Sequence, residues 1–226
     1  MSASTLAPPK AVILDLDGTL VDTVQTRIDA WLQTFAEQGI PADRSFVSAL
    51  IGSDGRQLAV QVGEVAGVVV DDQRSEQIDA RSGATYLELN ANPHILPGVT
   101  LVLDALDAAG IPWAVATSSR REQVGPSLAA LGRSNAPLIV DGTTVKLAKP
   151  HPDLLLAAAK ALHTETAACW CVGDARWDML AAVAAGMRAI GITAGSAVTA
   201  DQLREAGASL VLPTLAELVP YLKAPN

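Results

Sequence analysis

The sequence predicts an α/β fold, in which helices cover both faces of a parallel β-sheet and a helical segment is inserted near the start. The first observation is the second half of the chain, residues 97–226, where short apolar runs alternate with amphipathic helical patterns. Such alternation is typical of parallel strands joined by crossover helices. The second observation is an isolated apolar run at residues 11–14, which predicts a buried strand of the same sheet. The third is the stretch between these regions, which shows only helical spacing.

The inserted stretch is predicted to contain helices alone. Val24, Ile28 and Phe35 recur at helical spacing, and Gly39 marks the end of this first helix. Further helices are expected at residues 44–50, 56–66 and 71–90. We therefore predict a separate helical domain at residues 23–96.

From residue 97 onward, strands and helices alternate. The expected order is helix 99–109, strand 113–117, helix 120–131, strand 137–140, helix 151–162, strand 168–172, helix 177–185, strand 188–192, and a last helix, strand and helix ending near residue 222. Together with residues 10–22, this part is expected to form a Rossmann-like core. Residues 1–9 are expected to be a flexible tail.

Composition restricts the possible partners. The chain has 226 residues and is 50% hydrophobic, which is enough for a large core and a second small domain. Because the formal net charge is −8, we expect neither a nucleic-acid polymer nor an anionic membrane as a partner. No apolar stretch reaches the length of a membrane span. The first residues also lack the basic and then apolar pattern of a secretory signal.

The only two cysteines, Cys169 and Cys171, lie in one apolar run. We expect their side chains on opposite faces of a strand, and therefore as buried, unpaired thiols. Unpaired thiols are typical of a reducing compartment. The sequence thus predicts a cytoplasmic location.

The most informative segment follows the first predicted strand. Asp15 and Asp17 stand where this strand ends, and Gly18 allows a sharp turn after them. Side chains two residues apart on a strand face the same side, so the two carboxylates should repel each other unless a cation or a shared proton lies between them. An Asp-Gly pair also occurs in ordinary turns. The rest of the chain has to decide between these two interpretations.

Open α/β sheets bind ligands beyond the carboxyl ends of their strands. Three further polar segments are expected at that edge, namely residues 117–119, Lys149, and Asp174 with Asp178. Each has an ordinary explanation: a helix cap, a solvated lysine, or a carboxylate in the first turn of a helix. Their convergence on one edge of the sheet, in this order, is much less expected by chance and favours a functional site.

These motifs resemble those of the haloacid dehalogenase-like hydrolase superfamily, in its branch of phosphatases and phosphomutases that includes phosphoglycolate phosphatase. Residues 15–19 are similar to the first motif of the family, Thr117 to the second, Lys149 to the third, and Asp174 with Asp178 to the fourth. The inserted helices stand where the family places a mobile cap domain. The resemblance covers nearly the whole chain after residue 10.

The resemblance implies a phosphomonoester hydrolase with an aspartyl-phosphate intermediate. Asp15 would be the nucleophile. Asp17 would protonate the leaving group and later activate water. Thr117 and Lys149 would hold and neutralise the transferring phosphate.

The same resemblance implies Mg²⁺ as the cofactor, because oxygen ligands suit this ion. Its ligands would be Asp15, the backbone carbonyl of Asp17, and Asp174, while Asp178 would bind the ion or orient a water. The carboxylates of Asp15, Asp17 and Asp174 are expected to converge.

The substrate is expected to be a small phosphorylated metabolite. Gly18 and Ser118 are expected among its binding residues. The loop at residues 52–56 resembles the specificity loop of the cap in sugar-phosphate members of the family, and Arg56 is the expected contact to the leaving group. Arg56 could instead be a solvated residue at a helix start, and Arg120 and Arg121 are alternative contacts.

Several alternatives remain open. A sugar phosphomutase is one of them, although Arg27 stands where those enzymes have a histidine. A catalytically inactive regulatory relative is another. A response-regulator-like module is disfavoured by the chain length, and a dehalogenase by the acidic residue Asp17. Phosphoglycolate, small sugar phosphates and nucleotide monophosphates all fit the motifs as substrates.

Overall fold

A parallel sheet forms the centre of the computed structural model, which describes residues 7–134 and 137–223. Within these residues its six strands are β1 (Ala11–Leu14), β2 (Trp113–Ala116), β3 (Leu138–Val140), β4 (Cys169–Gly173), β5 (Arg188–Ile192) and β6 (Leu210–Leu212). Their order is β3-β2-β1-β4-β5-β6, so β1 lies in the middle and pairs with β2 and β4. This arrangement confirms the predicted α/β class. Most of the predicted tail, residues 1–6, lies outside the described residues.

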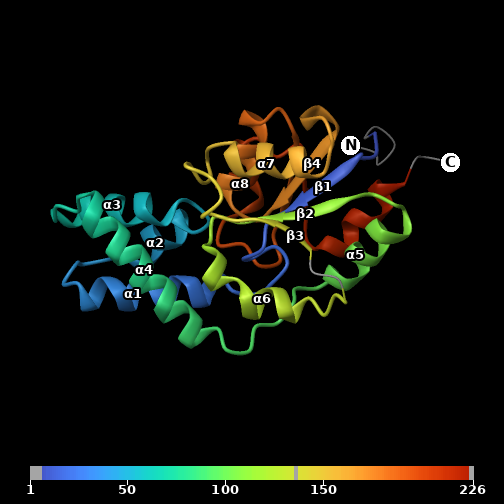
Figure 1. Ribbon diagram of the computed structural model, residues 1–226. Coiled ribbons are helices and arrows are strands. Elements are labelled where there is room, and N and C mark those ends of the chain that lie inside the picture. Colours follow the sequence, from blue (N-terminus) through green and yellow to red (C-terminus); the bar gives the residue numbers. More distant parts are fainter. Residues whose placement is uncertain (1–6, 135–136, 224–226) are drawn as a thin grey trace.

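Helices cover both faces of the sheet. They are α5 (Val99–Ala108), α6 (Gly125–Ala130), α7 (Asp153–Ala161), α8 (Arg176–Ala184) and α9 (Ala200–Glu205), with the 3-10 helices η2 (Arg121–Gln123), η3 (Thr166–Ala168) and η4 (Leu215–Leu222). Val12 and Leu14 of β1 pack in the cluster that contains α5 and η4, whereas Ala11 and Ile13 pack in the cluster that contains α7, α8 and α9. Strand alternation thus builds two core layers. Figure 1 shows α7 and α8 on one side of the sheet and α5 on the other.

Four helices between β1 and α5 form what we call the helical module, residues 24–89. They are α1 (Val24–Glu37), α2 (Arg44–Leu50), α3 (Gly55–Ala66) and α4 (Asp72–Leu89). The module has its own apolar cluster, in which Ile28, Phe35 and Ile78 are fully buried. Figure 1 shows it beside the sheet, at the end where the site described below lies. None of the described helices is long and apolar enough to span a membrane.

Two elements differ from their predicted form. The helix expected at residues 120–131 is divided into η2 and α6, because Gly125 and Pro126 interrupt it and proline lacks the N–H for a helical hydrogen bond. The last helix, η4, is a 3-10 helix and contains Pro220. Tight 3-10 turns tolerate the absent donor over a short length. The expected position of both segments in the chain is nevertheless correct.

The expectation for the cysteines was partly wrong. Cys169 and Cys171 are free and buried as predicted, but both lie in the layer that contains α7 and α8. They are two residues apart on β4, and a strand places such residues on the same face. Their burial still keeps the two thiols away from solvent.

Candidate active site

The predicted residues at the ends of the central strands meet at one edge of the sheet. Asp15 directly follows β1, and its N–H donates to the carbonyl of Val172 on β4 over 2.9 Å. Thr117 directly follows β2, and its N–H donates to the carbonyl of Val140 over 3.0 Å. Asp174 follows β4. Pairing between neighbouring strands therefore brings these three residues together, as the strand-end rule predicts.

Three buried carboxylates form a compact acidic cluster there. Oxygen atoms of Asp15, Asp174 and Asp178 lie within 4.8 Å of one another. Lys149 is almost fully buried and contacts Asp15 at 2.5 Å and Asp178 at 2.7 Å. Its ammonium also donates to the carbonyl of Ala116 over 2.7 Å. One lysine therefore faces three carboxylates, which leaves the cluster with excess negative charge.

Burial and mutual repulsion change the protonation of this cluster. Burial, with repulsion from Asp178 and Asp17, raises the pKa of Asp15 from 3.8 to about 7 even though Lys149 opposes the change. Burial and the charges of Asp15 and Asp178 also raise the pKa of Asp174 well above its ordinary value. A divalent cation would relieve this repulsion, and an all-oxygen ligand set suits Mg²⁺. The described residues thus fit the metal that the sequence predicts.

The turn formed by Gly18 and Thr19 packs directly against the side chain of Asp174. Gly18 has φ +86°, and a Cβ there would lie 2.3 Å from Oδ2 of Asp174. The hydroxyl of Thr19 donates to Oδ1 of Asp174 over 2.8 Å. Only a glycine therefore fits at position 18, because of both its positive φ and this close approach. The contact of Gly18 in the structure is to Asp174, and Gly18 does not line the pocket described below.

Asp17 departs from the expected convergence of carboxylates. Among the described residues the acidic cluster consists of Asp15, Asp174 and Asp178, and the side chain of Asp17 is not part of it. Its Oδ1 accepts hydrogen bonds from Thr23 over 2.7 Å and from Tyr86 over 3.0 Å. Its Oδ2 accepts from Arg27 over 2.9 Å and from Ser119 over 2.8 Å. The expectation was wrong because these four contacts stabilise the carboxylate where it is, whereas a place beside Asp15 and Asp174 would put it next to two other anions.

These partners change the pKa of Asp17. Burial alone raises it, but the ion pair with Arg27 and the hydrogen bonds from Thr23 and Ser119 bring it below its ordinary value. The guanidinium of Arg27 also donates to Gln123 over 3.0 Å and lies 3.4 Å above the ring of Tyr86. Asp17 is therefore held as an anion at neutral pH by side chains from both the core and the helical module.

Sequence reasoning missed several of these partners. Tyr86 and Gln123 had no local signal that linked them to Asp17, whereas Ser119 belongs to the polar segment 117–119 that was expected at this edge of the sheet. For Arg27 a signal was present, since it is a charged residue between Val24 and Trp31 on the apolar face of a predicted helix. A charge at such a position usually has a buried partner.

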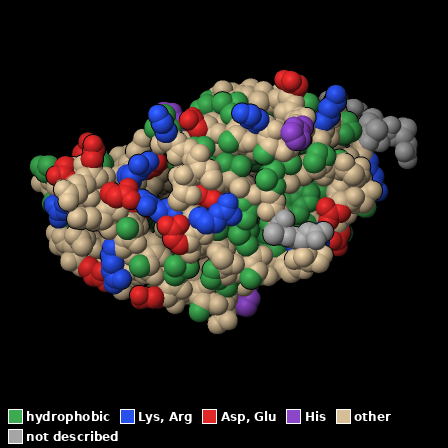
Figure 2. Space-filling view, viewed as in Figure 1, with side chains coloured by type: hydrophobic (Ala, Val, Ile, Leu, Met, Phe, Trp, Pro, Cys, Tyr) green, Lys and Arg blue, Asp and Glu red, His purple; other side chains and the backbone are tan. Residues whose placement is uncertain are grey.

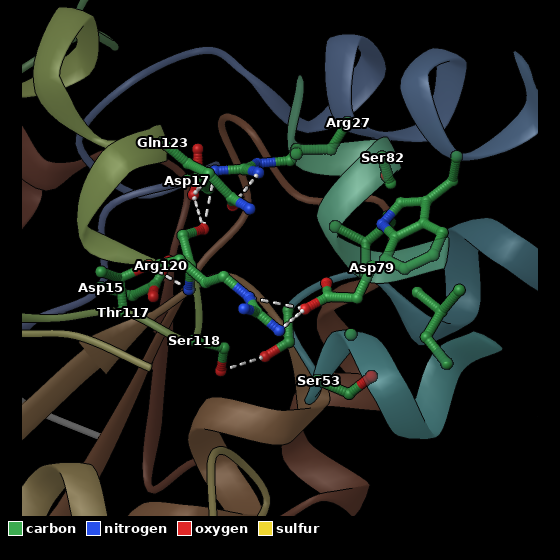
Figure 3. Close-up of a pocket in the computed structure, with 17 residues that line it drawn as sticks. Asp15, Asp17, Arg27, Ser53, Asp79, Ser82, Thr117, Ser118, Arg120 and Gln123 are labelled. Carbon is green, nitrogen blue, oxygen red and sulfur yellow. Dashed lines mark hydrogen bonds and ion pairs between the residues drawn. The ribbon is translucent and has the colours of Figure 1, made fainter. Parts of the chain in front are cut away.

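A pocket opens above Asp15 between the core and the helical module. Asp15, Asp17, Thr117 and Ser118 line it from the core. Figure 3 shows Asp15 and Thr117 on one side, with Asp79 and Ser82 of α4 on the opposite side. Ser118 donates to the carbonyl of Gly52 over 2.9 Å, which joins the core to the module at the pocket wall. Figure 2 shows charged side chains of both signs gathered along the junction of module and core.

The three arginines considered for substrate contact have different positions. Arg120 lines the pocket. Arg56 lies outside it, where it is 45% exposed and forms an ion pair of 2.8 Å with Asp54, the N-cap of α3. Arg121 forms an ion pair of 2.8 Å with the buried Asp141. Of the three arginines, Arg120 is therefore the one placed to contact a substrate in this pocket.

Comparison with known proteins identifies the family. The family model described as "Haloacid dehalogenase-like hydrolase" matches residues 12–192. The chain belongs to the haloacid dehalogenase-like hydrolases. The match includes the first strand, the helical module and the sheet as far as β5. The family assigned from the four motifs is thereby confirmed.

Individual members of this hydrolase family are similar over nearly the whole chain. "Probable phosphatase IndB" of Dickeya dadantii is 34% identical, with 92% of this chain and 91% of that protein covered. "Phosphoglycolate phosphatase 1" of Pseudomonas aeruginosa is also 34% identical, over 94% of this chain and 79% of that protein. The crystal structure of a hydrolase from Pseudomonas syringae has a TM-score of 0.87 at 31% identity, covering 94% and 97%. These relatives support the phosphatase branch of the family.

The acidic cluster of this hydrolase leads to a prediction about stability. Raised pKa values of Asp15 and Asp174 mean that the folded, metal-free protein keeps protons that the unfolded chain releases. For Asp15 this holds between pH 3.8 and about 7, so its contribution to the free energy of unfolding falls as pH rises through that window. We therefore expect Mg²⁺ to raise Tm by several degrees at about pH 7.5 and by much less at about pH 5.

The matched variant for this experiment is Asp174→Asn, which removes one repelling charge. In chelator at about pH 7.5 its Tm should equal or exceed that of the parent protein, and added Mg²⁺ should change it little. Asp201→Asn, at a position 85% exposed, serves as the control and should respond to Mg²⁺ as the parent does. Equal Mg²⁺ responses of Asp174→Asn and the parent would contradict a metal site at this cluster.

Proposed function

We propose that this protein is a Mg²⁺-dependent phosphatase that hydrolyses small phosphomonoesters through an aspartyl-phosphate intermediate. The observation that carries the proposal is the buried cluster of Asp15, Asp174, Asp178 and Lys149, which meets the pocket at Asp15. Oxygen ligands for a metal, a lysine and a carboxylate nucleophile are the groups that phosphoryl transfer needs. Bound Mg²⁺, held by Asp15, Asp174 and the carbonyl of Asp17 and supported by Asp178, would neutralise charge on the phosphoryl oxygens.

In the first step, a carboxylate oxygen of Asp15 attacks phosphorus and the bond from phosphorus to the leaving oxygen breaks. Lys149 balances the charge beside the attacking carboxylate, and the hydroxyl of Thr117 is placed to bind a phosphoryl oxygen. Asp17 is the proposed donor of the proton that the departing alkoxide needs; it must first take up this proton against the contacts with Arg27, Thr23 and Ser119 that lower its pKa. The products of this step are the free alcohol and the aspartyl phosphate.

In the second step, water attacks the aspartyl phosphate. Asp17 is then an anion and accepts a proton from this water, while the bond from phosphorus to Asp15 breaks and phosphate leaves. The contacts of Asp17 with Thr23, Arg27 and Tyr86 suit this role, because they orient the carboxylate and stabilise its ionised form. Arg27 and Tyr86 belong to the helical module and Thr23 is the N-cap residue of α1, so closure of the module would align this group.

The helical module is proposed as a cap that closes the pocket over the substrate, with domain boundaries at residues 23–96. Its loop meets the core through Ser118, and the N–H of Asp54 donates to the carbonyl of Lys149 over 3.1 Å. Such closure excludes water and adds contacts to the leaving group. Hydrolysis is favoured over a phosphomutase reaction because Arg27 occupies the mutase histidine position and binds Asp17. A cytoplasmic location stays a prediction, supported by the two free thiols.

The test uses an aryl phosphate, whose leaving group requires no protonation and few contacts. We expect hydrolysis in the presence of Mg²⁺, nearly complete loss of activity in EDTA, and recovery when Mg²⁺ is added in excess. Release of phosphate and of the phenol should be measured together, since a phosphatase releases equal amounts. Full activity in chelator would contradict the metal site, and no activity under any condition would favour an inactive regulatory relative.

A further inference from the structure

The wall of the pocket opposite Asp15 carries a charged pair. Asp79 belongs to α4, and Arg120 lies in the loop after β2. Oδ2 of Asp79 accepts from Nε of Arg120 over 2.9 Å and lies 2.8 Å from its Nη2. The same Nη2 lies 2.6 Å from Oε1 of Glu76. In Figure 3 Arg120 extends toward Asp79 and away from Asp15 and Thr117.

The positive charges that line this pocket are already balanced. Arg27 is paired with Asp17 at 2.9 Å, and Arg120 is shared between Asp79 and Glu76. Two guanidinium groups thus face three carboxylates on this side of the described structure. Burial raises the pKa of Asp79 despite the opposing effect of Arg120, which also indicates that its negative charge is not fully compensated. A second anionic group on a substrate would meet a wall without surplus positive charge.

Hydrogen-bonding capacity remains on this wall. The contacts with Arg120 use Oδ2 of Asp79, and its other oxygen, Oδ1, lies beside Gly55. A Cβ at position 55 would be 2.0 Å from Oδ1, so the carboxylate of Asp79 fits here only because residue 55 is a glycine. Ser82 also lines the pocket, three residues after Asp79 and therefore on the same face of α4. Acceptor and hydroxyl groups thus lie side by side.

We infer that the Asp79–Arg120 pair selects a leaving group that is uncharged and carries hydroxyl groups, and that it discriminates against a leaving group with a carboxylate. This inference rests on the proposed phosphatase function. A hydroxyl can donate to Asp79 and accept from Arg120 or Ser82 without breaking the ion pair. A carboxylate only accepts, so it would compete with Asp79 and Glu76 for Arg120 and lie beside their charges.

The candidate substrates differ in the charge of their leaving groups. Polyol and sugar phosphates have the favoured leaving groups. Phosphoglycolate, which the names of several relatives mention, carries a carboxylate on its leaving group and is expected to be a poor substrate here. A site that binds a hydroxyl by hydrogen bonds commonly rejects an analogue that cannot complete them.

The experiment compares substrates of equal carbon number. Glycerol 3-phosphate is compared with 3-phosphoglycerate, and 2-hydroxyethyl phosphate with phosphoglycolate, so that in each pair a terminal alcohol replaces a carboxylate. We expect kcat/KM of the alcohol to exceed that of the carboxylate by about tenfold or more in both pairs. For any compound turned over too slowly, its Ki as a competitor of aryl phosphate hydrolysis gives the same comparison.

Variants then test whether Asp79 causes the preference. Asp79→Asn keeps the shape of the side chain but removes its charge. It should lower the ratio of kcat/KM for the alcohol to kcat/KM for the carboxylate about fivefold or more, chiefly by raising kcat/KM for the carboxylate substrate. Glu76→Gln, at a half-exposed position, should fold readily and change the ratio in the same direction by less. The control is Glu37→Gln, which breaks a similar ion pair with Arg81 on the module surface and should leave the ratio unchanged.

The outcomes separate this inference from the proposed function. If the parent protein hydrolyses aryl phosphate with Mg²⁺ but prefers or equally accepts the carboxylates, the inference is wrong and the phosphatase proposal stands. If Asp79→Asn and Glu76→Gln are folded by thermal denaturation and both keep the parent ratio, the pair does not determine specificity. If aryl phosphate itself is not hydrolysed, the proposed function has failed.

Discussion

Replacement of Asp15 by Asn is expected to lower phosphatase activity by at least about 100-fold, and to abolish the covalent phosphoenzyme. An amide has nearly the same shape as a carboxylate but is a much weaker nucleophile. Rapid-quench experiments with a labelled phosphomonoester measure the phosphoenzyme, and steady-state phosphate release measures turnover. We expect both signals to be lost together, for aryl and alkyl substrates alike.

This substitution should not unfold the protein. Burial already disfavours the charged form of Asp15, whose pKa is raised to about 7, and Lys149 keeps its contact of 2.7 Å with Asp178. The Tm of Asp15→Asn in chelator should therefore be close to that of the parent or higher. Asp22→Asn, at an exposed position seven residues later, is the matched control and should retain activity. More than about 1% of parental turnover in Asp15→Asn would mean that another group is the nucleophile.

Replacement of Lys149 by Met is expected to have the second largest effect. It removes the ammonium that contacts Asp15 and Asp178 while keeping a side chain of similar length. We expect kcat/KM to fall by about 100- to 1,000-fold, the usual result of removing one charged donor at a transferring group. The factor should be the same for every phosphomonoester, because all of them present the same phosphoryl group.

The same variant should be less stable without metal. Three buried carboxylates would lose their lysine, and breaking a buried ion pair commonly costs about 3–5 kcal/mol. Denaturant unfolding with and without Mg²⁺ measures this loss and its partial recovery. Lys160→Met, at an exposed position on α7, is the control for loss of a lysine charge. If kcat/KM of Lys149→Met instead falls by widely different factors for different substrates, Lys149 takes part in recognition of the leaving group.

Local patterns in the sequence predicted the framework of the site. Each strand of the core is a short apolar run, and Asp15, Thr117 and Asp174 directly follow such runs. Because parallel strands align their carboxyl ends, adjacency in space follows from order in the chain once the strands pair. Deviations occurred where one proline or glycine altered a helix, as at Pro126 and Pro220. Such residues change the helix type without moving the segment.

The assignment of side chains to partners was less predictable. Asp17 was expected to join Asp15, but Tyr86, 69 residues away, and Ser119, 102 residues away, take part in holding it elsewhere. Arg56 was expected in the pocket because of its glycine-rich loop, but the nearby carboxylate of Asp54 binds it outside. Each outcome depends on competition between partners, which spacing along the chain does not describe.

The sequence by itself determined the fold class, the family and the edge of the sheet at which Asp15, Thr117, Lys149 and Asp174 meet. These follow from strand periodicity and from motifs of consecutive residues, which are local properties of the chain. Only the tertiary structure decided that the side chain of Asp17 stays outside the acidic cluster, where Arg27 and Tyr86 hold it. Only the tertiary structure also placed Asp79 against Arg120 across the pocket. The physical reason is that the charge and hydrogen bonding of a buried group depend on neighbours that packing brings from distant segments.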